Sequence, residues 1–116
     1  MATTPVSSIL MFLTAAFFGA LGQYFYKSGA ELANKGALSY IANPRLILGV
    51  ACYLAVMVLF MAAFKRGGSM ATLYPIYAST FIWGAVISHF AFGTEIRLVN
   101  ILGMGLIGLG MYFLGL

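Results

Sequence analysis

Residues 70–92 form an apolar run that carries an unusual set of groups able to form hydrogen bonds. Tyr74, Tyr77, Thr80 and Ser88 are spaced so that they fall on one face of a helix. Hydroxyl groups in hydrocarbon cost free energy unless a partner satisfies them. We therefore expect this face to hydrogen-bond either a polar ligand such as a sugar, or a neighbouring helix.

The same run contains Pro75 and Trp83. Proline removes a backbone donor and clashes with the carbonyl group four residues earlier, so we expect a kink that frees the carbonyl of Ala71. Trp83 lies off the hydroxyl face, and it is too far from the ends of the run to belong to an interfacial aromatic belt. We include Trp83 among the residues expected to contact a ligand.

A second polar group lies at the end of the first apolar run, where Gln23 and Lys27 share one helix face. The Lys27 stem can reach the level of lipid headgroups and offer three donors to a phosphate. The competing interpretation is that Lys27 marks the end of the helix and pairs with Glu31. Glu95 precedes the last apolar run and is expected at the start of a helix, where a negative charge is favourable.

Composition determines the fold class, because 63% of the 116 residues are hydrophobic and only 7% are charged. A soluble domain would carry about 25% charged residues. The sequence therefore predicts an all-α integral membrane protein, a single domain over residues 1–116, with four transmembrane helices of about 20 residues each. The expected helices cover residues 8–33, 44–65, 69–92 and 95–116.

Several classes of function are excluded by the sequence. The net charge of +4 does not predict nucleic-acid binding, because the six basic residues lie in connections or at helix ends. Cys52 is the only cysteine and lies inside an apolar run, so neither a disulfide framework nor a cysteine metal site is expected. Without a metal cluster, a nucleophile–base pair or a phosphate loop, we expect no enzyme activity, no catalytic residue, no metal and no cofactor.

Glycines form stripes on the first and last expected helices, where they let a second backbone approach closely in lipid. Because four short helices offer little surface, we expect the last helix to pack against a second subunit. This subunit is either a second copy of the chain or a similar four-helix protein. The glycines assigned to packing and oligomerisation are Gly19, Gly22, Gly105, Gly108 and Gly115.

The basic residues give little information on membrane orientation. Lys65 and Arg66 lie in the second connection, and the others lie in the first and third. Such a small bias favours both termini outside, and it leaves insertion in both orientations open. Parallel and antiparallel dimers are therefore both compatible with the sequence.

Four short motifs resemble the drug/metabolite transporter superfamily, and within it the four-helix small multidrug resistance (EamA-like) type. The resemblance implies a small multidrug resistance-like helix bundle in the bacterial inner membrane. The motifs are GQYFYKSGA at residues 22–30, YPIYAS at 74–79, FGTE at 92–95 and GMGLIGLG at 103–110.

One position departs from the multidrug exporters, which carry a glutamate in the middle of the first helix that binds protons and cationic drugs alternately. The aligned position here is Gly19, and no acid precedes Glu31 in the chain. A lipophilic cation in a low dielectric needs a counter-charge, so this resemblance does not predict drug–proton antiport.

A closer resemblance is to the small subunits of the flippase that moves aminoarabinose linked to undecaprenyl phosphate. These subunits have a similar Gly-Gln motif followed by a lysine, a similar Tyr-Pro start to the third helix, and a glutamate before the fourth. The resemblance implies substrate-contacting roles for Gln23, Lys27, Tyr74, Tyr77 and Glu95.

These observations lead to three functional hypotheses. The first is a dimeric transporter subunit that moves a polyprenyl-phosphate-linked sugar, or a similar amphipathic anion, between leaflets. The second is an exporter of a small cationic or neutral metabolite or drug, which uses hydroxyls and aromatic faces in place of a buried acid. The third is a non-transporting membrane accessory subunit whose glycine stripes bind a larger partner.

Overall fold

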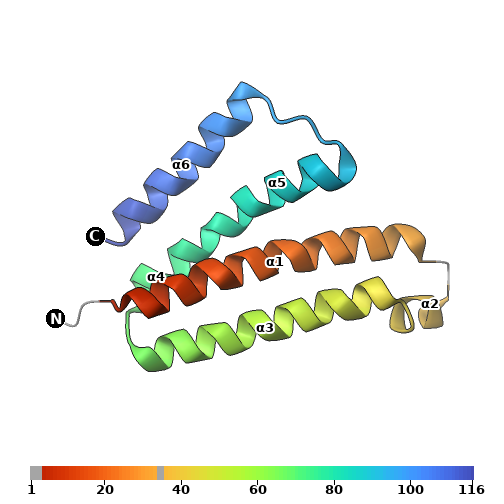
Figure 1. Ribbon diagram of the computed structural model, residues 1–116, viewed down its shortest axis with the longest axis horizontal. Coiled ribbons are helices and arrows are strands. Elements are labelled where there is room, and N and C mark those ends of the chain that lie inside the picture. The colour runs from red at the N-terminus through yellow and green to blue at the C-terminus, as the bar shows by residue number, and fades with distance from the viewer. Residues whose placement is uncertain (1–3, 34–35) are drawn as a thin grey trace.

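The computed structural model describes residues 4–33 and 36–116, and these residues form helices and connections without any strand (Figure 1). The elements in chain order are α1 (Val6–Leu32), α2 (Ala37–Ile41), α3 (Pro44–Arg66), α4 (Met70–Ile76), the 3-10 turn η1 (Tyr77–Ser79), α5 (Thr80–Phe92) and α6 (Leu98–Leu114).

The predicted all-α class is confirmed, and three segments are long and apolar enough to cross a membrane. These segments are α1, α3 and the continuous stretch Met70–Phe92 that comprises α4, η1 and α5. Helix α6 is apolar but has 17 residues, which at 1.5 Å per residue span about 26 Å of a hydrocarbon core about 30 Å thick. A fourth crossing by α6 stays a prediction.

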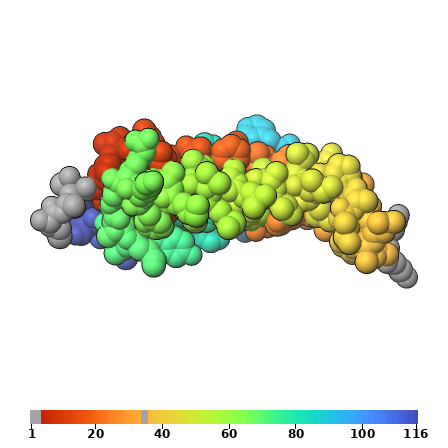
Figure 2. Space-filling model, turned by 90° about the horizontal axis from the view of Figure 1, so that it is seen from below, coloured from red at the N-terminus to blue at the C-terminus, as the bar shows by residue number. Residues whose placement is uncertain are grey.

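Helix α1 lies at the centre of the molecule, between α3 on one side and α4, η1 and α5 on the other (Figure 1). Helix α3 runs along the length of one face of the molecule (Figure 2). Glycines permit the close approach of α1 and α3. The position of a Cβ on Gly22 is 2.8 Å from the Tyr53 ring, and that of a Cβ on Gly49 is 2.6 Å from the Tyr26 ring.

The core lies where the first turns of α1 pack against the last turns of α3 and against α4. Phe12 is fully buried, with its ring stacked on Phe60 at a centroid distance of 4.5 Å. The buried Ser8 hydroxyl lies 2.9 Å from both the Ala63 and the Gly67 carbonyl oxygens. The Ala63 carbonyl also accepts from the Gly67 backbone N–H, so the serine adds a second hydrogen bond there and bonds the Gly67 carbonyl just beyond the end of α3.

Helix starts follow local capping signals. The Asn43 side chain accepts from the Arg45 backbone N–H at 3.0 Å, and Pro44 is the first helical residue of α3. Ser69 caps α4 in the same way by accepting from the Thr72 N–H at 3.1 Å. Both caps are residue types that commonly begin helices.

Helix α6 begins at Leu98, later than the residue 95 expected from the sequence. The Arg97 backbone N–H donates to the Asn100 side chain at 2.8 Å, and this bond marks the start of the helix. Glu95 therefore lies in the connection, ahead of the first turn of α6, where the interaction expected with the helix dipole is weak.

Near Pro75, where the sequence predicts a kink, the α-helix α4 gives way to the 3-10 turn η1. Beyond this turn α5 continues alongside α1, whereas α6 diverges from α5 toward the 93–97 connection (Figure 1). Helix α6 contacts α4 and η1 near the C-terminus, and none of its residues is buried.

Replacing Gly49 by alanine is expected to destabilise the protein. The new methyl group meets the Tyr26 ring and lies 3.2 Å from the Gly22 carbonyl oxygen, and the backbone cannot move aside as a side chain can. We expect a loss of about 1–3 kcal/mol, measured by thermal unfolding in detergent with circular dichroism. The control Gly103→Ala, which meets nothing within 4 Å, should leave the melting temperature unchanged or higher. Equal melting temperatures for the two variants would contradict this packing.

Candidate functional site

A recess of about 360 Å³ lies between α1, α3 and the segment that begins at η1. It brings together three residues predicted to contact a ligand, Gln23, Tyr77 and Thr80. Gly19, which also lines it, lies about 20 Å along α1 from Val6. The recess is therefore near the middle of a helix long enough to cross a membrane. Its other lining residues are Ala20, Tyr53, Phe81 and Gly84.

The Tyr77 phenol occupies the space that a side chain at Gly19 would fill. A Cβ built on Gly19 collides with the Tyr77 hydroxyl and lies 3.3 Å from the Thr80 Oγ1. On its other side the Tyr77 ring packs edge-on against Phe60 of α3 at a centroid distance of 5.1 Å. Gly19 therefore acts as a close-approach site within one chain, which places the hydroxyls of η1 and α5 against α1.

Gln23 is held by a residue of α3 that the sequence interpretation did not assign to the site. The Gln23 Nε2 donates to the Tyr53 hydroxyl at 2.6 Å, and the Tyr53 ring stacks on Tyr26 at 5.2 Å. Gln23 and Lys27 share a helix face but have different partners. The signal for this contact in the sequence is the single tyrosine within the apolar run of α3.

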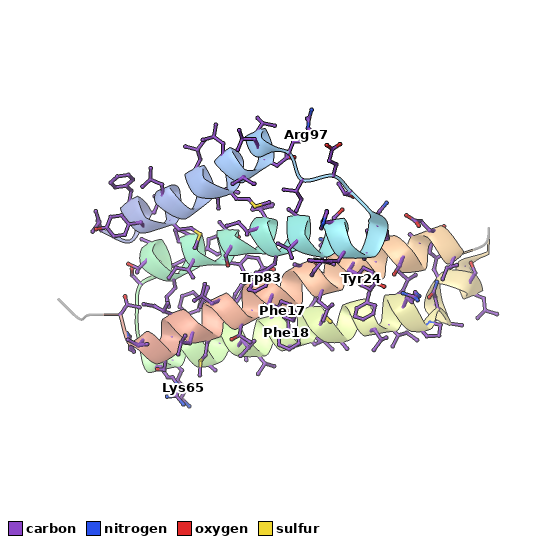
Figure 3. The ribbon with its side chains drawn as sticks, turned by 45° about the horizontal axis from the view of Figure 1, so that its top comes forward. Phe17, Phe18, Tyr24, Lys65, Trp83 and Arg97 are labelled. Carbon is purple, nitrogen blue, oxygen red and sulfur yellow. The ribbon has the colours of Figure 1, made fainter. Side chains whose placement is uncertain are left out.

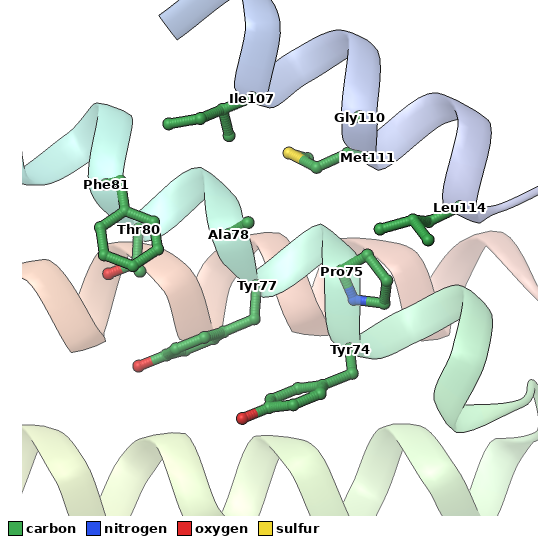
Figure 4. Close-up of a pocket in the computed structure, with 10 residues that line it drawn as sticks. All are labelled: Tyr74, Pro75, Tyr77, Ala78, Thr80, Phe81, Ile107, Gly110, Met111 and Leu114. Atoms are coloured by element: carbon green, nitrogen blue, oxygen red, sulfur yellow. The ribbon is translucent and has the colours of Figure 1, made fainter. Parts of the chain in front are cut away.

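A second recess, of about 500 Å³, separates α4, η1 and α5 from α6 (Figure 4). Ile107, Met111 and Leu114 extend into it from α6, and the wall across from them includes Pro75 and Ala78. Tyr74 and Tyr77 border this space, with their rings directed away from α6 in Figure 4. The recess is almost entirely apolar, so it suits a hydrocarbon chain better than a polar headgroup.

Trp83 and Ser88 lie apart from the Gln23 recess. Trp83 packs edge-on against Phe17 of α1, with ring centroids 5.2 Å apart (Figure 3). The Ser88 hydroxyl shares a 2.6 Å hydrogen bond with that of Thr94, near the far end of α5. Ser88 and Glu95 line a third recess, of about 550 Å³, between α5 and α6. The predicted polar face is therefore divided among three locations.

Lys27 pairs with Glu31, as the competing interpretation of the sequence predicts. Its Nζ lies 2.9 Å from a Glu31 carboxylate oxygen, and the two side chains are 58% and 57% exposed. The ammonium also lies over the Phe92 ring, 5.1 Å from the centroid. Lys27 thus joins the end of α1 to the end of α5 through a cation–π contact.

Arg45 is a further polar residue that the sequence interpretation treated only as a charge in a connection. Its Nη1 donates to the Tyr24 hydroxyl at 3.3 Å and to the Ser28 hydroxyl at 3.2 Å. Nearby, the Asn43 side-chain amide donates to the Gly29 carbonyl oxygen at 2.8 Å. These bonds connect the first turn of α3 to the last turns of α1.

Within residues 4–33 and 36–116, no group of three or more His, Cys, Asp or Glu side chains is placed to hold a metal ion. The candidate site is therefore a set of neutral hydrogen-bonding groups between helices. Its polar members are one amide, two phenols and one alcohol. Such groups can bind hydroxyl-rich or amide-containing ligands by donating and accepting hydrogen bonds.

Neither the models of known protein families, nor curated proteins, nor solved structures contain a match to this chain. Membership of the drug/metabolite transporter superfamily, inferred above from short motifs, therefore stays a prediction.

A double-mutant cycle on Gln23 and Tyr53 tests the polar contact in the recess. We expect Gln23→Ala and Tyr53→Phe each to destabilise the protein, with a coupling energy of about 1 kcal/mol, as for hydrogen bonds between membrane helices. The measurement is reversible unfolding in mixed micelles. Additive effects of the two substitutions would show that the 2.6 Å hydrogen bond does not contribute to stability.

Proposed function

We propose that this chain is a transporter subunit that moves a polyprenyl-phosphate-linked sugar, or a similar amphipathic anion, between the leaflets of the bacterial inner membrane. In this proposal four helices form a small multidrug resistance-like bundle that works as a dimer. The supporting observation is the recess in which Gln23, Tyr53, Tyr77 and Thr80 gather near the middle of α1.

Neutral groups suit a sugar headgroup better than a cation. A cation that enters a low-dielectric site requires an opposing carboxylate. The chain has two acidic residues, Glu31 and Glu95, and both lie outside this recess. Amides and hydroxyls both donate and accept, so they can replace the water molecules that a sugar loses when it leaves the headgroup layer.

The surroundings of Gly19 also favour a sugar headgroup over a cation. It aligns with the position at which the multidrug exporters carry their acid, and in this chain a tyrosine hydroxyl occupies the adjacent space. A carboxylate side chain at residue 19 would collide with Tyr77. The chain therefore presents a phenol at the depth where those exporters present a negative charge.

One feature of α6 supports the proposed dimer. A Cβ on Gly105 or Gly108 meets nothing within 4 Å in the described part of the chain, so this stripe is open to a second helix. Gly115 is nearer to the rest of the chain, since a Cβ there would lie 3.9 Å from the Thr72 side chain.

The apolar recess beside α6 gives the lipid tail a place next to the polar recess, because Tyr77 and Thr80 line both.

Translocation of a fluorescent short-chain polyprenyl phosphate sugar in proteoliposomes tests the proposal. We expect wild-type protein to move the probe and Thr80→Val to move it about tenfold more slowly, because a hydrogen bond to the headgroup is lost. Thr14→Val is the matched control. Thr14 is exposed on α1 and bonds only its own helix, at the Leu10 carbonyl, so its replacement should leave the rate unchanged.

Three outcomes would contradict the proposal. Proton-coupled uptake of a cationic dye without movement of the lipid probe would favour the exporter. Absence of any transport, together with a stable hetero-complex that depends on the glycines of α6, would favour the accessory subunit. Equal transport rates for Thr80→Val and Thr14→Val would show that the recess is not on the transport path.

A further inference from the structure

One end of the molecule carries more positive charge than its acidic residues neutralise. Here the last turns of α1 meet the first turn of α3 and the end of α5. Lys27 and Arg45 both lie at this end, and Glu31 pairs with Lys27. The pair Lys27–Glu31 is the only salt bridge among the described residues, so Arg45 has no carboxylate partner among them.

The contacts of Arg45 leave most of its hydrogen-bonding capacity available. Both of its contacts use the same nitrogen, Nη1, and at 3.2 and 3.3 Å they are longer than the usual 2.9 Å. A guanidinium has five N–H donors in a planar fork. The Nε and Nη2 donors have no acceptor within the described ranges. The side chain is partly buried, so its unpaired charge is only partly hydrated.

The Tyr24 hydroxyl adds a second donor beside the guanidinium. It accepts from Arg45, and its own proton has no acceptor among residues 4–33 and 36–116. The ring is held between Phe92, at a centroid distance of 5.6 Å, and Phe25, at 5.2 Å. The same Phe92 ring lies under the Lys27 ammonium, so Tyr24 and Lys27 share an aromatic neighbour.

We propose that Arg45 and Tyr24 form a binding site for the phosphate group of an anionic lipid. Helix α3 is long enough to cross a membrane, and Arg45 lies in its first turn, which places the guanidinium at headgroup depth. Arginine binds phosphate in a bidentate, charge-assisted way that neutral hydroxyls cannot provide. The site does not depend on the transport proposed above, and a phospholipid of the surrounding leaflet can fill it.

Binding of dioleoyl phosphatidic acid to the full-length protein, measured by native mass spectrometry from detergent, tests this site. We expect Arg45→Gln to weaken binding about tenfold, because the charge and the fork are both lost. The matched control is Arg66→Gln, because Arg66 is exposed at the opposite end of α3. The affinity of this variant for phosphatidic acid should stay within about twofold of wild type. Dioleoylglycerol, which lacks the phosphate, should bind all three proteins equally.

A second variant keeps the test informative if Arg45→Gln does not fold. Tyr24→Phe retains the ring contacts and removes only the hydroxyl, and we expect phosphatidic acid binding to fall about threefold to tenfold. Competition with inorganic phosphate then identifies the source of the ligand. Displacement of the lipid at millimolar phosphate would support a site for phosphate in general, and retention of the lipid would support a site specific for lipid headgroups.

The inference would be overturned if Arg45→Gln and Arg66→Gln bound phosphatidic acid equally. Loss of dioleoylglycerol binding in parallel with phosphatidic acid would overturn it as well, because Arg45 would then act only on the fold. Phosphatidic acid binding by a protein that does not translocate the polyprenyl probe would support the site and contradict the proposed function. The two proposals therefore fail independently.

Discussion

The close approach of α1 to its neighbours depends on positions where a side chain is missing. The Tyr77 phenol occupies the space that a side chain at Gly19 would fill. The rings of Tyr53 and Tyr26, each on the facing helix, do the same at Gly22 and Gly49. In an apolar environment helix association gains little from burial, so close backbone contact and hydrogen bonds must supply it. The same glycines that allow the helices to pack therefore also direct phenol groups toward the middle of α1, and the polar recess is a consequence of that packing.

The described helices divide into a packed group, formed by α1, α3, α4, η1 and α5, and a loosely attached last helix, α6. Buried residues occur along α1 and α3 and include Leu73 of α4, whereas α6 has none and makes most of its contacts with α4 and η1. Such an arrangement leaves the apolar recess beside α6 open, with Pro75 and the 3-10 turn η1 on its wall. A second subunit packed on α6 would close this side, which is why the proposed transport activity is assigned to a dimer.

Features governed by neighbours in sequence were predictable, and those governed by helix rotation were not. The helical class, the caps at Asn43 and Ser69 and the Lys27–Glu31 pair all follow from spacings of a few residues. The partners of Arg45 lie 17 and 21 residues before it, and Gln23 is 30 residues from Tyr53. Such pairs require the relative rotation of two helices, which hydropathy does not specify. The single-face model of residues 70–92 grouped Ser88 with Tyr77, although they lie in different recesses.

In the proposed function a polar headgroup passes through the recess beside Gly19 during transport. The most direct measurement is photo-crosslinking with a polyprenyl phosphate sugar that carries the reactive group on its sugar, followed by peptide mapping. We expect adducts on residues 19–23 and 77–84, at a higher yield than with a phospholipid probe that carries the same group. Adducts confined to the exposed face of α6, or equal yields from the two probes, would contradict it.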